Sequence, residues 1–158
     1  DGSGGELLKI EAGGSRKPAS AETVAGREHF IKMDGREVFK FAVKIMGESA
    51  ERALAQCGIP ASDVDLFVPH QANVRIIESA TRRLDIPPEK VFVNVGKYGN
   101  TSAGSIPIAL HEAYYSGRIR EGNVIVTVGF GAGLTWASCV MRWTLPTVQT
   151  VSADQEGA

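Results

Sequence analysis

The sequence contains few cysteines and no excess of charge of either sign. Its only two cysteines, Cys57 and Cys139, form no CxxC pair and have no histidines nearby at metal-binding spacing, so we predict no metal site. Lys and Arg total 17 and Asp and Glu total 18, which gives no support for a nucleic-acid or membrane partner. We therefore interpret the two cysteines as buried thiols in a reducing compartment.

Long uncharged runs are also scarce, and the one present does not look like a membrane helix. Residues 124–141 carry no charge, but glycines interrupt the middle and Val and Thr dominate the first half. This pattern predicts two strands joined by a glycine turn. The chain begins with "DGSGGELLKI", without an initiator Met or a signal peptide, so we expect it to start in the middle of a fold.

The remaining pattern predicts an α/β protein with a mainly parallel sheet and helical crossovers. A helix over residues 36–56 is apolar on more than one face, which is typical of a helix buried between two layers. Residues 144–158 are polar and aperiodic, and we expect a flexible tail there. Strands are predicted over 6–11, 65–69, 91–95, 124–128 and 134–142, further helices over 73–84 and 102–116, and a loop-rich segment over 13–34.

Three polar features follow strands and should therefore meet at one edge of the sheet: His70, Asn100 and the glycine turn "GFGAG" at residues 129–133. Taken singly, each has a plainer explanation: a structural histidine, a helix-capping asparagine and an ordinary turn. A dinucleotide-binding loop is disfavoured because a strand follows the glycines. Together, the three supply N–H donors that can stabilise negative charge on a carbonyl oxygen.

Four motifs in order, "MDGREVFK", "VPHQANVRI", "GNTSAGSIPIAL" and "GFGAGLTW", resemble the C-terminal half of β-ketoacyl-acyl-carrier-protein synthase III. The resemblance covers roughly residues 1–143. It implies a thiolase-like fold, of which this chain would form one β-α-β-α-β-α-β-β half of a layered αβαβα architecture. It also implies a Cys-His-Asn active site, in which His70 and Asn100 supply the histidine and asparagine. The backbone N–H of Ala132 would form the oxyanion hole, with a methyl group where many relatives have glycine.

The implied reaction is a decarboxylative Claisen condensation between an acyl-coenzyme A primer and malonyl-acyl-carrier protein, which initiates fatty-acid synthesis. His70 would act as a neutral N–H donor, and no cofactor is implied beyond the coenzyme A thioester that serves as substrate. The family also implies a cytoplasmic homodimer.

The nucleophile is not predicted in this chain. Cys57 ends a helix, where the helix dipole opposes a thiolate, and Cys139 lies inside a strand. We therefore expect a separate N-terminal half to carry the catalytic cysteine and this chain alone to be inactive. That half would cover the helix over 37–55 and the open sheet edge.

Arginines gather on one face of the helix over 73–84, opposite its apolar residues. A solvated charged face is the ordinary interpretation. The resemblance implies instead a docking surface for the acidic acyl carrier protein and, beside it, a pantetheine tunnel. The predicted docking residues are Lys40, Gln71, Ala72, Asn73, Val74, Arg75, Arg82 and Arg83, and the predicted tunnel residues are Met33, Gly35, Phe39, Ala72 and Asn73.

Two alternatives stay open. One is a related condensing enzyme that makes a polyketide, quinolone or hydroxymethylglutaryl-type product. The other is a catalytically inactive half that binds only acyl carriers or a partner chain.

Overall fold

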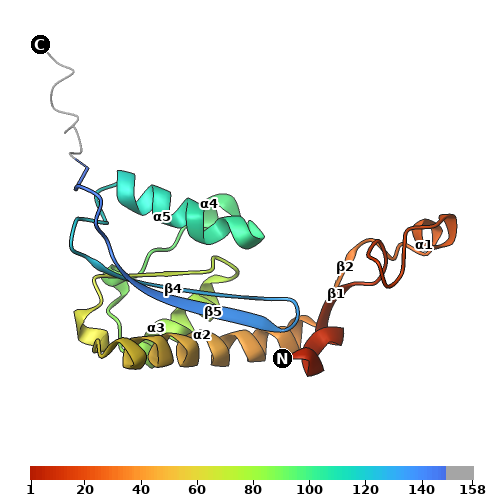
Figure 1. The fold of residues 1–158 in the computed structure, drawn as a ribbon, viewed down its shortest axis with the longest axis horizontal. Coiled ribbons are helices and arrows are strands. Elements are labelled where there is room, and N and C mark those ends of the chain that lie inside the picture. The colour runs from red at the N-terminus through yellow and green to blue at the C-terminus, as the bar shows by residue number, and fades with distance from the viewer. Residues whose placement is uncertain (149–158) are drawn as a thin grey trace, which may run out of the picture.

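A three-stranded sheet with helices on both faces forms the body of the protein (Figure 1). We describe residues 1–148 of a computed structural model. The strands β3 (Leu66–Pro69), β4 (Val124–Gly131) and β5 (Thr135–Arg142) lie in the order β3-β4-β5. The pair β3–β4 is parallel and the pair β4–β5 is antiparallel, as expected from the helical crossovers before β4 and the glycine turn after it.

The first face of the sheet is covered by α2 (Gly35–Cys57) and α3 (Val74–Leu84). Both helices begin at a capping side chain, because Asp34 accepts from the N–H groups of residues 36 and 37 and Asn73 accepts from Arg75. Gly58 ends α2 with a φ of 65°. A core that includes Met46, Phe67, Ile77 and Val126 lies between these helices and the sheet.

The second face is covered by α5 (Ser105–Tyr115), which follows the short helices α4 (Val95–Tyr98) and η4 (Ser102–Gly104). Leu66 and Val68 of β3 point to this side and pack with Ala109 and Ala113, whereas Phe67 points to the α2 side. A strand buried on both faces needs apolar residues at every position. Residues 66–69 are therefore apolar throughout and do not alternate between apolar and polar side chains.

An arm, residues 8–33, extends away from the body (Figure 1). It follows η1 (Gly2–Leu7) and consists of β1 (Leu8–Ile10), α1 (Ala21–Ala25) and β2 (Ile31–Met33), with β1 and β2 antiparallel. The strand predicted over 6–11 therefore belongs to a separate sheet. The loop-rich prediction for 13–34 was wrong for α1, which begins at a reciprocal capping box between Ser20 and Thr23.

Three further predictions were wrong. Residues 91–95 form no strand, since only Val91 bridges to Phe67 before α4 begins. The short helix η2 (Ala61–Asp63) connects α2 to β3, and η3 (Pro88–Lys90) lies between α3 and α4. The helix α2 is not enclosed between layers, because its outer surface is charged and exposed. Its several apolar sides face α3 and the sheet. Finally, Cys57 and Cys139 are both exposed.

The uncharged run over 124–141 forms the predicted strand pair β4–β5. Among residues 1–148, no helix combines the length and apolar character needed to cross a membrane. The predicted tail begins with residues 144–148, where Tyr114 Oη donates to the carbonyl of Pro146 and Thr147 Oγ1 accepts from the N–H of Glu121. The rest of the predicted tail, residues 149–158, lies outside the described residues.

Candidate active site

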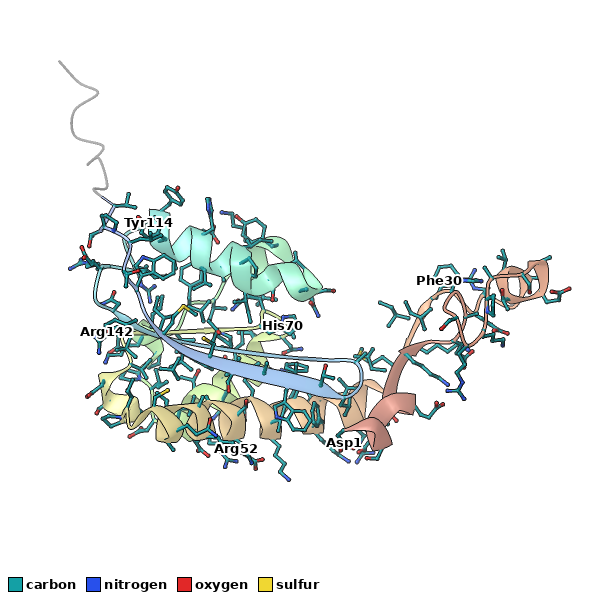
Figure 2. All side chains as sticks on the ribbon, in the orientation of Figure 1. Asp1, Phe30, Arg52, His70, Tyr114 and Arg142 are labelled. Atoms are coloured by element: carbon teal, nitrogen blue, oxygen red, sulfur yellow. The ribbon has the colours of Figure 1, made fainter. Side chains whose placement is uncertain are left out.

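His70 follows β3 directly and is held by both backbone and side-chain contacts. Its N–H donates to the carbonyl of Val128 at 2.7 Å, which extends the β3–β4 pairing by one residue. The imidazole stands edge-on to the ring of Phe130, with centroids 5.3 Å apart. The residue is 8% exposed, and this burial lowers the pKa of the imidazole, so the neutral form is favoured. Figure 2 shows His70 at the end of the sheet nearest the arm.

Ser105, the first residue of α5, contacts the histidine ring. Its Oγ lies 2.5 Å from His70 Nδ1 and also accepts the backbone N–H of Gln71 at 3.2 Å. We did not predict this serine, although it lies within the quoted motif "GNTSAGS". A sequence does not show that the start of one helix will meet the end of a distant strand.

Asn100 lies in the loop between α4 and η4. Its Oδ1 accepts the N–H of Ser102 at 2.9 Å. The helix-capping explanation was wrong, because Thr101 and Gly104 precede η4 and α5 and neither helix has a side-chain cap. The amide Nδ2, the donor end, makes no hydrogen bond within residues 1–148. The loop therefore uses only the acceptor end of the side chain and leaves the donor end free of bonds in the described part of the chain.

Ala132 lies in the turn between β4 and β5. Its carbonyl accepts from Thr135 Oγ1 at 3.0 Å, whereas its N–H donates to no residue in the described part of the chain. The backbone N–H thus remains available, as an oxyanion donor requires.

His70, Asn100 and Ala132 line one mainly apolar cavity of about 990 Å³, so the predicted convergence at the sheet edge is present. All five residues predicted for the tunnel line the same cavity: Met33, Gly35, Phe39, Ala72 and Asn73. The arm also contributes a wall that we did not predict, formed by Leu8, Ile10 and Ile31, and Ile31 is 69% exposed. Neither Cys57 nor Cys139 lines the cavity.

Gln71 was predicted to contact a carrier protein, but the structure buries it at 1% exposure. Its Nε2 donates to the carbonyls of Pro69 and Phe92 at 2.8 and 3.1 Å. Its Oε1 accepts the N–H groups of Asn94 and Val95 at 2.8 and 3.2 Å. A single side-chain amide therefore joins the end of β3 to the segment that leads to Asn100. The side-chain amide of Gln71 is therefore fully used within the fold and is not available to a docking partner.

The basic residues predicted for docking fall into two groups. Arg75 and Arg82 are exposed on α3 and make no ion pair within residues 1–148. Arg83 instead donates from Nε and Nη2 to the carboxylate of Glu51 on α2, at 2.9 and 3.0 Å. Its side chain also passes over Gly47, where an added Cβ would lie 2.5 Å from Arg83 Cδ. Arg83 therefore fastens α3 to α2.

Two other predicted docking residues, Lys40 and Val74, do not line the cavity but follow the cavity residues Phe39 and Asn73. Lys40 Nζ bonds to Glu37 Oε1 at 2.6 Å on the exposed face of α2. Val74 is exposed at the start of α3, beside Asn73. Exposed Arg36, which follows the cavity residue Gly35, was not predicted.

Comparison with known proteins identifies the relatives of this chain. A family model described as 3-oxoacyl-[acyl-carrier-protein] synthase III C terminal matches residues 54–143. The β-ketoacyl-[acyl-carrier-protein] synthase III of Natranaerobius thermophilus is 59% identical over 143 residues, which are 90% of this chain and 44% of that protein.

Solved structures agree with these matches. The synthase III structure from Thermus thermophilus is 46% identical with a TM-score of 0.78, covering 90% of this chain and 43% of that one. The priming β-ketosynthase of the R1128 polyketide pathway is 32% identical with a TM-score of 0.80, covering 92% and 43%. The chain thus spans less than half the length of these relatives, and it has their thiolase-like fold. It belongs to the β-ketoacyl-[acyl-carrier-protein] synthase III family and corresponds to the C-terminal half of its members.

Proposed function

We propose that this chain supplies the decarboxylation and oxyanion-binding part of a condensing enzyme that initiates fatty-acid synthesis. The observation that carries the proposal is the convergence of three uncommitted donors on one apolar cavity: His70 Nε2, Asn100 Nδ2 and the Ala132 N–H. Donors fixed in an apolar cavity stabilise developing negative charge more strongly than water does.

The roles follow from the chemistry of each donor. A cysteine thiolate from an N-terminal half attacks the thioester of an acyl-coenzyme A, takes the acyl group and releases coenzyme A as its thiol. Malonyl-acyl-carrier protein then loses carbon dioxide, and the enolate oxygen accepts hydrogen bonds from His70 and Asn100. The enolate carbon attacks the acyl thioester, and the Ala132 N–H stabilises the tetrahedral oxyanion. Collapse of this intermediate breaks the C–S bond, which releases the β-ketoacyl product and returns the thiolate to the cysteine. Burial lowers the pKa of His70 and so favours its neutral imidazole. His70 can then donate a hydrogen bond from Nε2 while the ring itself stays uncharged.

The cavity also suits the pantetheine arm that both substrates share. Met33, Phe39 and Ala72 give it apolar walls, and Asn73 lies at its edge as the cap of α3. Arg75 lies two residues after Asn73 on α3. It is exposed and free of ion pairs in the described part of the chain, which favours contact with an acidic carrier. Arg82 and Lys40 are weaker candidates, because one lies two turns farther along α3 and the other is bonded to Glu37.

A second candidate is the priming step of a polyketide pathway. The similarity to the R1128 priming β-ketosynthase favours it, at 32% identity over 92% of this chain. Both reactions use the same donors and differ in the acyl group that is accepted.

The test is a hybrid synthase, in which the matching segment of the Natranaerobius thermophilus enzyme is replaced by this chain. We expect the hybrid to bind an acyl group from acyl-coenzyme A on the cysteine of the N-terminal half and to release carbon dioxide from malonyl-acyl-carrier protein. Acyl labelling followed by intact mass, with acetyl and longer primers, distinguishes the two candidates. A folded hybrid that is acylated but never decarboxylates the malonyl substrate would contradict the proposed function.

A further inference from the structure

The hydroxyl of Ser105 can donate one hydrogen bond and accept two, and the neighbouring groups determine which of these bonds form. Ser105 is 2% exposed, so water does not compete for them. One lone pair of Oγ accepts the backbone N–H of Gln71 at 3.2 Å, and this N–H can only donate. The remaining partner within residues 1–148 is His70 Nδ1 at 2.5 Å.

The two tautomers of a neutral His70 differ in what they do to that hydroxyl. If Nδ1 carried the proton, both lone pairs of Oγ would be filled by N–H donors, and the buried hydroxyl proton would have no acceptor among the described residues. If Nδ1 is unprotonated, the hydroxyl donates to it and every group is satisfied. Buried polar groups are almost always satisfied, which selects the second arrangement.

We infer that Ser105 is a positioning residue that fixes His70 as the Nε2–H tautomer. The bond made by one imidazole nitrogen determines the protonation of the other. Nε2 makes no hydrogen bond within the described part of the chain, and His70 lines the cavity. The proton is therefore held on the nitrogen that remains free for a ligand oxygen. Its use in catalysis rests on the proposed function, but the tautomer itself does not.

The backbone N–H of Gln71 holds Ser105 Oγ in this arrangement. This N–H occupies one lone pair of Ser105 Oγ, which leaves the hydroxyl proton directed at the ring. Because Gln71 follows His70 in the chain, the end of β3 and the start of α5 are joined by two bonds that share one oxygen. Loss of the serine hydroxyl would remove both of these hydrogen bonds.

Imidazole ¹⁵N NMR of the chain tests the inference, since protonated and unprotonated ring nitrogens have distinct shifts. The His70 signals are assigned by their loss in His70→Gln, which separates them from those of His29 and His111. At a pH where the ring is neutral, we expect a protonated Nε2 and an unprotonated Nδ1. A protonated Nδ1 in the unsubstituted protein would overturn the inference, and the same spectrum of the hybrid synthase gives the answer if the chain alone is unfolded.

Ser105→Ala should then produce a mixture of tautomers, while Ser105→Thr, which keeps the hydroxyl, should retain Nε2–H. Ser49→Ala is the matched control, because Ser49 is also a buried serine, but it bonds to Ser138. In the hybrid, we expect Ser105→Ala to lower the decarboxylation rate by roughly 10- to 100-fold, as is typical when a partner that orients a functional histidine is lost. An unchanged tautomer in Ser105→Ala would refute the role. A correct tautomer in an inactive hybrid would refute only the proposed function.

Discussion

The two faces of the sheet carry helices of opposite character. On the first face, α2 and α3 bury one side and expose charge on the other, including Lys44 and Arg52 of α2. On the second face, α5 packs Ala109 and Ala113 against the sheet and carries no charge on its far side, where Ile108, His111 and Tyr115 lie one or two turns apart. A charged outer face suits water, and an uncharged one suits a protein neighbour.

This difference corrects the prediction about which helix lies between layers. Apolar residues on several sides of α2 indicated a sandwiched helix, yet those sides meet α3 and the sheet. The helix suited to a central layer is α5, which is shorter and starts at the active site. In a layered αβαβα fold, the N-terminal half would then cover α5. Since Ser105 begins α5 and Asn100 precedes it, the same surface would bring the cysteine near the donors.

The largest expected effect comes from placing a charge on each face in turn. In the hybrid synthase, Ile108→Glu should lower the free energy of unfolding by about 3–5 kcal/mol, because it buries an unpaired carboxylate. The matched change on the other face, Lys44→Glu, should stay within about 0.5 kcal/mol. Chemical denaturation measures both, and Ile108→Ser serves if the glutamate variant is insoluble. Equal, small losses would show that α5 does not face the N-terminal half.

The next effect concerns the site where the two faces meet. In the hybrid, His70→Ala and Asn100→Ala should each reduce malonyl decarboxylation by about 10²–10³-fold, because each removes a donor to the enolate oxygen. Acyl transfer to the cysteine should be nearly unchanged, since neither side chain is the nucleophile. His29→Ala, which removes a histidine of the arm that does not line the cavity, is the control. Decarboxylation at the unsubstituted rate in either variant would contradict the assignment.

Local features of the sequence predicted most of the elements, whereas long-range contacts decided the errors. Gly58 marked the end of α2, and the end of β3 placed His70 at the sheet edge. Asn100 also lines the cavity, although the strand predicted before it does not form. The partners of Gln71 could not be predicted, because the sequence does not distinguish an exposed glutamine that contacts a partner from a buried one that bonds to the backbone. Arg83 was likewise indistinguishable from Arg75 until Glu51 and Gly47 of α2 were placed beside it. Val91 lies beside β3, but residues 92–94 leave the sheet before α4 begins at Val95.

A smaller effect should separate the two arginines on the first face. Arg75→Glu in the hybrid should lower kcat/KM for malonyl-acyl-carrier protein by roughly 5- to 30-fold, equivalent to 1–2 kcal/mol, with less effect on malonyl-coenzyme A. The loss should diminish at high salt. Arg83→Ala should instead leave the preference between the two substrates unchanged and reduce stability, because it removes a bond between α3 and α2. Equal losses with both malonyl substrates would mean that Arg75 contacts the shared pantetheine or supports the fold.

The smallest effect is a dependence of stability on pH that arises from His70. Burial lowers the pKa of its imidazole in the folded protein below the ordinary value of 6.5. As the pH falls below 6.5, the unfolded chain therefore binds the proton first, and the folded state loses stability until the pH reaches the folded pKa. The slope from one group is at most about 1.4 kcal/mol per pH unit. Urea unfolding between pH 8 and pH 5 should show this loss in the hybrid, and His70→Gln, which cannot titrate, should show a flatter profile. A steeper or identical profile in the variant would mean that the histidine is not desolvated, and the apolar cavity between the two faces would then not keep its donor neutral.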